Sequence, residues 1–155
     1  MTSQQLKALI DELRKPQYQS LGDQEALDMV DSMTVRVKRK VPVVDVKQWA
    51  IEEAIYAQIV LGQQSPDERI KRICISIVGW IDDAGGRVQN VDLDKQTAID
   101  MMQGLVHFGI ATETQIQRLR SLQWVTLKWT ESVGVGTLDV QEIAKLRERI
   151  NLGIS

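Results

Sequence analysis

The chain has few of the residue types on which most site chemistry depends. Its 155 residues include one cysteine, Cys74, and one histidine, His107. A single cysteine excludes an intramolecular disulfide and cannot supply the several thiolates of a structural zinc site. A single histidine excludes a cluster of imidazoles at metal-ligand spacing. We therefore expect no disulfide framework, no metal site and no cofactor.

The sequence also lacks long apolar runs and a recognisable targeting segment. No uninterrupted apolar stretch approaches the roughly 18 residues that a membrane-spanning helix needs. The first residues, Met1 to Gln5, have neither the basic start nor the apolar run of a secretory signal. We expect an intracellular protein made in a reducing compartment, with no membrane partner.

The composition is that of a globular domain. Hydrophobic residues make up 43% of the chain and charged residues 26%, with a formal net charge of -2, which argues against intrinsic disorder. A chain of this length can bury a core of its own. The small net charge gives no general attraction to nucleic acid, so any such contact needs a local patch. We expect one compact domain over residues 1–155.

Helix signals dominate the pattern of apolar residues. The strongest is Ser65-Pro66-Asp67-Glu68, in which a capping serine and a proline at the first helical position open a helix. Six apolar residues follow at a spacing of three and four, which predicts one buried stripe: Ile70, Ile73, Cys74, Ile77, Val78 and Ile81. Similar signals predict helices over 3–14, from 23, over 45–62, from 92 or 94 to 109, over 112–122, over 126–129 and from 139. The predicted fold is all-α, with about eight helices and no convincing sheet.

Three segments are expected within this domain. Residues 1–33 form a small helical hairpin broken at Pro16. Residues 34–44 form an extended basic segment, and residues 45–155 form the main helical core.

The extended basic segment is the main surface candidate. Valines at 35, 37 and 41 alternate with Arg36, Lys38 and Lys40, Arg39 adds a further charge, and Pro42 follows, a pattern typical of extended backbone. Such a segment can lie along phosphates or contact an acidic neighbouring subunit. It lacks interleaved aromatic residues, so base stacking is not indicated. Protein contact, nucleic-acid contact and a solvated strand face remain open.

Tryptophan is the most frequent aromatic residue, at positions 49, 80, 124 and 129, against one phenylalanine and two tyrosines. Tryptophan is favoured both in cores and at interfaces. Trp124 and Trp129 lie in a weakly periodic region, so we expect at least one of them at an interface.

Three patterns with catalytic or ligand-binding potential have simpler structural explanations. Cys74 and His107 form a nucleophile pair only if the fold brings them together, and neither lies in a local signature for that chemistry. The carboxylates at 82–83, 92 and 94 do not have the spacing of a calcium-binding loop and fit caps and turns better. Gly134-Val135-Gly136 lacks the strand, third glycine and lysine of a phosphate loop. We expect no catalytic residues and no enzyme activity.

Many short helix-and-turn motifs of the chain resemble a family of small, largely uncharacterised helical proteins of tailed bacteriophages. In the second half the matching positions are Leu93-Asp94, Met102, Leu105-Val106, Gly109 to Thr112, Leu119, Leu122, Thr126, Trp129, Glu131, Gly134 to Thr137, Asp139-Val140, Ile143-Ala144 and Arg147. In the first half they are Gln5-Leu6, Pro16, Tyr18, Leu21, Asp23, Val43 and Val46. The resemblance spans most of the chain.

The resemblance implies a virion structural or assembly protein of the head, neck or tail, made in the host cytoplasm. Its expected partners are other virion proteins, within an oligomeric assembly, with no small-molecule substrate. The interaction residues we expect are Arg36, Lys38, Arg39, Lys40, Trp124 and Trp129. The alternative is a small DNA-binding or regulatory protein that uses Arg36 to Lys40, with nucleic acid the less favoured partner. A hydrolytic enzyme that uses Cys74 and His107 is a third hypothesis.

Overall fold

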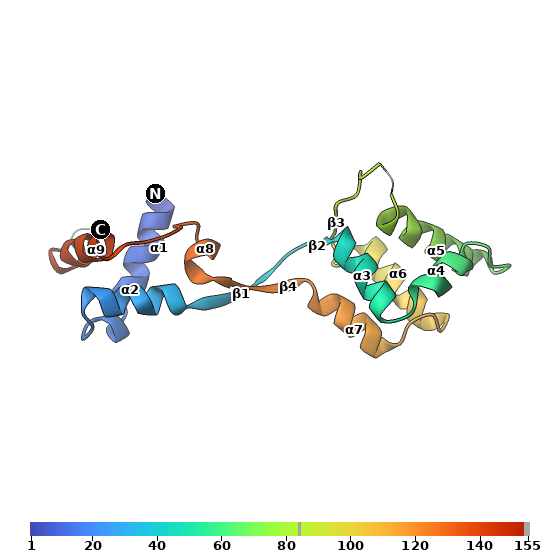
Figure 1. Ribbon diagram of the computed structural model, residues 1–155, viewed down its shortest axis with the longest axis horizontal. Helices are drawn as coiled ribbons and strands as arrows, with labels where there is room; N and C mark the ends of the chain where they lie inside the picture. Colours follow the sequence, from blue (N-terminus) through green and yellow to red (C-terminus); the bar gives the residue numbers. More distant parts are fainter. Residues whose placement is uncertain (84, 154–155) are drawn as a thin grey trace. The chain divides into compact units, whose positions relative to one another are not determined.

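A computed structural model describes residues 1–83 and 85–153. Helices dominate it, as expected (Figure 1). The helices are α1 (Ser3–Leu13), the 3-10 turn η1 (Pro16–Tyr18), α2 (Asp23–Ser32), α3 (Val43–Glu52), α4 (Tyr56–Gly62), α5 (Glu68–Ile81), α6 (Gln96–His107), α7 (Glu113–Ser121), α8 (Trp129–Ser132) and α9 (Val140–Asn151). The strands are β1 (Thr34–Lys38), β2 (Val41–Pro42), β3 (Asn90–Val91) and β4 (Trp124–Lys128).

The chain divides into two compact units. Residues 1–37 and those from 126 onward form unit 1, and residues 38–125 form unit 2. The expected grouping of 45–155 into one core is therefore corrected, since the residues from 126 onward pack with the N-terminal helices. The physical reason is that α9 buries its apolar face, with Ile143 and Leu146, against α1 and α2.

Unit 1 has its own apolar core beneath α1, α2 and α9. It consists of Leu9, Ile10, Leu13, Tyr18, Ala26, Leu27, Val30, Leu138, Ile143 and Leu146. Arg147 on α9 binds the turn before α2: its guanidinium donates to the Asp23 carboxylate at 2.7 Å, to the Leu21 carbonyl at 2.7 Å and to the Tyr18 carbonyl at 3.1 Å. Arg147 thus joins α9 to a turn that is distant in sequence.

Unit 2 is built around α5, which packs against α3, α4 and α6. Its predicted apolar stripe is confirmed: Cys74, Ile77 and Ile81 are buried and Ile70, Ile73 and Val78 are partly buried against the core. Glycines allow the neighbouring helices to approach closely. A Cβ at Gly62 on α4 would lie 2.3 Å from Cys74 Sγ, and one at Gly104 on α6 would lie 2.4 Å from Ile73 Cδ1.

The prediction of one continuous helix over 45–62 is wrong. The structure has α3 and α4 instead, separated at Ala54, whose φ of 60° is left-handed. The Ile55 amide donates to the Ala50 carbonyl at 2.9 Å and closes the end of α3. This redirects the chain so that Ile55 and Ile59 both enter the core, and their burial offsets the strain of a non-glycine residue at positive φ.

The all-α prediction is confirmed only as helix-rich, because two small two-stranded sheets are present, β1 with β4 and β2 with β3. In the second, Val41 faces Val91 in antiparallel register. The extended basic segment is confirmed up to residue 42, where it contains β1 and β2, but residues 43 and 44 belong to α3. The helix predicted over 126–129 is wrong, since residues 124–128 are β4 and the short α8 begins at Trp129. A run of aromatic and β-branched residues favours a strand once a partner strand is available.

Local capping signals are confirmed at some helix starts and shifted at others. Thr112 and Asp139 form the capping boxes of α7 and α9. The helix expected from Ser65 begins at Glu68, because the Asp67 carboxylate accepts the Arg69 amide at 2.9 Å and acts as the cap. Ser65 instead accepts the Asp67 amide at 3.2 Å in the preceding turn.

Candidate interaction surface

Two basic residues of the predicted interaction segment are held by carboxylates of unit 2. Lys38 Nζ lies 2.6 Å from Asp94 and 5.6 Å from the centre of the Trp124 ring. The Arg39 guanidinium lies 3.2 Å from Asp45. All of these groups are partly exposed, so each ion pair contributes little to stability. Their effect is to neutralise part of the segment's charge.

The backbone and side chain of Arg39 also fix the end of this segment. Its amide donates to the Gln123 carbonyl at 2.7 Å, and its Nε donates to the Leu122 carbonyl at 3.2 Å. Arg36 and Lys40, the other two predicted residues, are exposed. The structure therefore brings Lys38, Arg39 and Trp124 together, which the sequence did not predict.

The two tryptophans expected at an interface differ in exposure. Trp124 is 43% exposed. Trp129 packs against the core of unit 1, and its amide donates to the Met33 carbonyl at 2.8 Å. Trp124 is thus partly exposed, whereas Trp129 has a mainly structural role.

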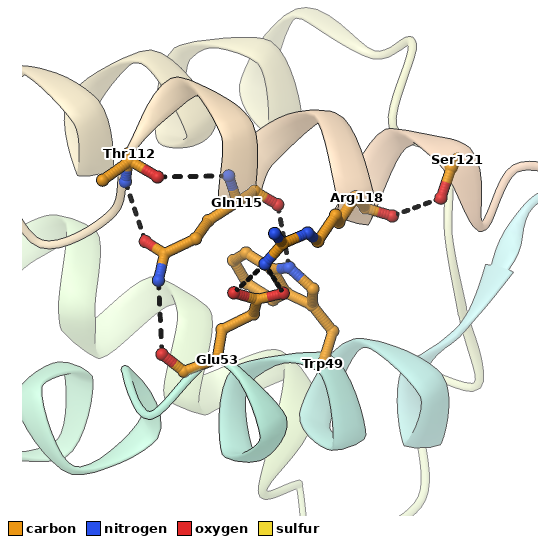
Figure 2. Close-up of polar contacts among 6 residues, drawn as sticks. All are labelled: Trp49, Glu53, Thr112, Gln115, Arg118 and Ser121. Atoms are coloured by element: carbon orange, nitrogen blue, oxygen red, sulfur yellow. Dashed lines mark hydrogen bonds and ion pairs between the residues drawn. The ribbon is translucent and has the colours of Figure 1, made fainter.

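A polar network joins α3 to α7 on unit 2 (Figure 2). The Trp49 indole donates to the Gln115 carbonyl at 2.9 Å, and Arg118 Nη1 lies 2.8 Å from both carboxylate oxygens of Glu53. The Gln115 side chain completes the Thr112 capping box and donates to the Glu53 carbonyl at 3.3 Å. The sequence predicted the helix start at Thr112 but not the contacts between α3 and α7, because the partners lie more than sixty residues apart and carry no local motif.

A second polar cluster joins α3, α4 and the end of α5. Asp82 accepts hydrogen bonds from Lys47 at 2.5 Å and from the Tyr56 hydroxyl at 2.6 Å. These bonds, first from Lys47 and then from Tyr56, lower the pKa of Asp82. The same bond to Asp82 raises the pKa of Lys47, which disfavours a neutral, nucleophilic amine. The arrangement therefore fits a structural clasp better than a reactive site.

The residues considered as catalytic or metal-binding candidates differ in burial and in their contacts. Cys74 is fully buried under Gly62, and its burial raises the pKa of the thiol. His107 is exposed at the end of α6, edge-on to Phe108. Asp83 accepts the amides of Gly85 and Arg87 in a turn. Within the described residues no three His, Cys, Asp or Glu side chains are grouped to hold a metal ion.

Large hydrophobic side chains are exposed mainly on unit 2. On α3, Val44 is 71% exposed and Ile51 49%, and their spacing of two helical turns places them on one face. Leu61 on α4 is 75% exposed and Ile75 on α5 is 47% exposed. The sequence did not indicate that these four residues are exposed, because an apolar residue in an amphipathic helix is first expected to lie in the core.

Among the helices of the described part of the chain, none has the length and apolar character that crossing a bilayer requires. A comparison of the chain with known protein families, with curated proteins and with solved structures finds no match.

Proposed function

We propose that this protein is a non-enzymatic structural or assembly component of a tailed-phage virion, in the head, neck or tail, and that it acts through protein–protein contacts. The observation that carries the proposal is the exposure of four large aliphatic side chains on unit 2: Val44, Ile51, Leu61 and Ile75. These side chains lie on α3, α4 and α5, which pack against one another, and each offers apolar area that a partner can cover. The motif resemblance to small phage proteins supports the virion setting.

The state of the basic segment favours protein over nucleic acid as the partner. Lys38 and Arg39 already face Asp94 and Asp45. Phosphate binding would have to compete with these carboxylates, and nearby negative charge repels a nucleic-acid backbone.

A small DNA-binding protein is the second candidate, and one specific observation favours it. The exposed Trp124 ring carries Lys38 over its face, and an aromatic ring beside a cation is the combination that binds single-stranded nucleic acid. A salt titration separates the two candidates, because phosphate contacts weaken steeply with ionic strength. DNA binding at low salt that Trp124→Ala abolishes supports the second candidate, and its absence at low salt removes it.

Mass spectrometry of purified particles tests the leading proposal. We expect the protein in particles at a copy number set by symmetry, such as five, six or twelve. A Leu61→Glu variant should fold normally, because the side chain is exposed, but should be incorporated at a reduced level. Gln64→Glu adds the same charge at another exposed position near the end of α4 and is the matched control. Absence of the protein from particles, or equal incorporation of both variants, contradicts the proposal or its use of this surface.

A further inference from the structure

The outward face of α5 is a continuous stripe on unit 2. Arg72, Ile75 and Gly79 are all exposed, and their spacing of three and four residues places them in line along the helix. Ile75 lies at the centre of this stripe with 47% of its surface exposed. The side chain of Arg72 has no hydrogen bond or ion pair within residues 1–83 and 85–153.

The packing of unit 2 does not require a glycine at position 79. Gly79 lies inside a 14-residue helix, where glycine is less favourable than alanine because it loses more backbone entropy. A Cβ at Gly79 would meet nothing within 4 Å. Gly62 and Gly104 differ, because a Cβ at either position would collide with α5. The space above Gly79 therefore lies on the outer surface, where only another molecule can fill it.

The charges along α5 are self-complementary in the antiparallel direction. Arg69, Lys71 and Arg72 lie near its start, with Glu68, while Asp82 and Asp83 follow its end. When two copies of α5 cross antiparallel about a two-fold axis level with Ile77, Ile75 of each faces Gly79 of the other. In the same register Arg72 faces Asp82, whose carboxylate also binds Lys47 and Tyr56, and Lys71 faces Asp83, which also accepts amides of the following turn. One arrangement therefore places the Ile75 side chain over the open space at Gly79 and the basic residues of one copy near the carboxylates of the other.

We infer that α5 is the contact surface of a symmetric dimer, in which two copies of this chain pack antiparallel with Ile75 of each over Gly79 of the other. Such an interface is isologous, since the same patch serves both subunits. This inference deepens the proposed assembly function, on which its biological meaning rests, by naming a second copy as one partner. A 14-residue helix spans only about 21 Å, so the interface is small and the expected dissociation constant is on the order of 10–100 µM.

Sedimentation of the full chain from about 5 to 500 µM, a range that brackets this estimate, tests the inference, with Gly79→Leu as the decisive variant. Leucine fills the space that Ile75 of the partner occupies, so dimerisation should weaken at least about tenfold. It also improves helix propensity, so the melting temperature of the monomer should rise by about 2–4 °C. Loss of the dimer therefore cannot be attributed to unfolding. Gln103→Leu adds leucine at an exposed position of α6 and is the matched control, with an unchanged dissociation constant.

A charge reversal provides the second test. Arg72→Glu should weaken the dimer several-fold at low salt, whereas Lys95→Glu, the same change at an exposed position off α5, should leave it unaltered. A chain that stays monomeric throughout, or a dimer that neither α5 variant weakens, overturns the inference. Either result leaves the proposed function standing if the protein is found in particles. A dimer broken by both variants in a protein absent from particles supports the inference and refutes the proposed function.

Discussion

Replacement of Gly62 by alanine tests whether the close contact of α4 with α5 organises unit 2. The added Cβ would lie 2.3 Å from Cys74 Sγ and 3.2 Å from Cys74 Cβ. Heavy atoms in van der Waals contact need about 3.5–4 Å, so the helices must separate by more than 1 Å or the thiol must move. The thiol is fully buried, and close-packed surroundings leave it little room.

The expected loss of stability follows from two opposing effects. Overpacking a core costs about 1–3 kcal/mol, and alanine recovers less than 1 kcal/mol of helix propensity, because Gly62 is the last residue of α4. We expect Gly62→Ala to lower the free energy of unfolding by about 1–2 kcal/mol, which corresponds to a fall of roughly 2–8 °C in melting temperature.

A double-mutant cycle with Cys74→Ala isolates the contact. Removing Sγ alone leaves a small cavity and should cost about 1 kcal/mol, but it also removes the atom with which the new Cβ collides. The double variant should therefore be at least as stable as Cys74→Ala, a coupling of about 1–2 kcal/mol. Urea denaturation followed by tryptophan fluorescence, to which the buried Trp49 contributes, measures the stability of each variant in the cycle. If the losses of stability in the two single variants simply add in the double variant, the reasoning is refuted. The destabilisation by alanine at position 62 would then not come from its contact with Cys74 Sγ.

Three further predictions concern other contacts. Gly104→Ala should change stability by less than about 0.5 kcal/mol, because the Ile73 methyl it meets ends a flexible side chain and helix propensity improves; thermal unfolding followed by circular dichroism checks this. Arg147→Lys should destabilise unit 1 by about 1–3 kcal/mol, since a lysine cannot donate to Asp23 and two carbonyls in the same planar geometry. Urea denaturation measures this loss, and it should show no such loss for Lys145→Arg, an exposed site on the same helix. Burial and the hydrogen bond to Glu12 raise the pKa of Tyr18 from 10.0 to about 12, so the folded state keeps a proton that the unfolded state releases. Stability present below pH 10 should fall by about 2–3 kcal/mol as the pH rises to 12, and a Tyr18→Phe variant that retains the whole of this fall contradicts the assignment.

The candidate surface was only partly predictable. The extended backbone of the basic segment agrees with what the alternation indicated, and Trp124 is exposed, but its place at an interface stays a prediction. The pairing of Lys38 with Asp94 and of Arg39 with Asp45 was not predictable, because nothing near position 38 in the sequence indicates position 94. The phage resemblance, the absence of enzyme activity and the choice of partner stay predictions, which the particle and salt experiments test.

Errors in the predicted elements occur where a distant contact outweighs local preference. Ala54 shows no local sign of a helix end, yet it adopts a left-handed conformation so that Ile55 can be buried. Residues 124–128 carry a plausible capping threonine but pair as β4 with β1. In both cases the deciding energy comes from residues that the local pattern does not include.

The sequence by itself determined the helix-rich class, the helix starts at Thr112 and Asp139 and the buried stripe of α5, because each depends on residues within one or two helical turns. Only the tertiary structure decided that the chain divides into two units and that the residues from 126 onward join the N-terminal helices. It also showed that Gly62 faces another helix whereas Gly79 faces open space. Local hydrogen bonds and apolar spacing specify a helix, but which apolar face meets which depends on burial summed over the whole fold.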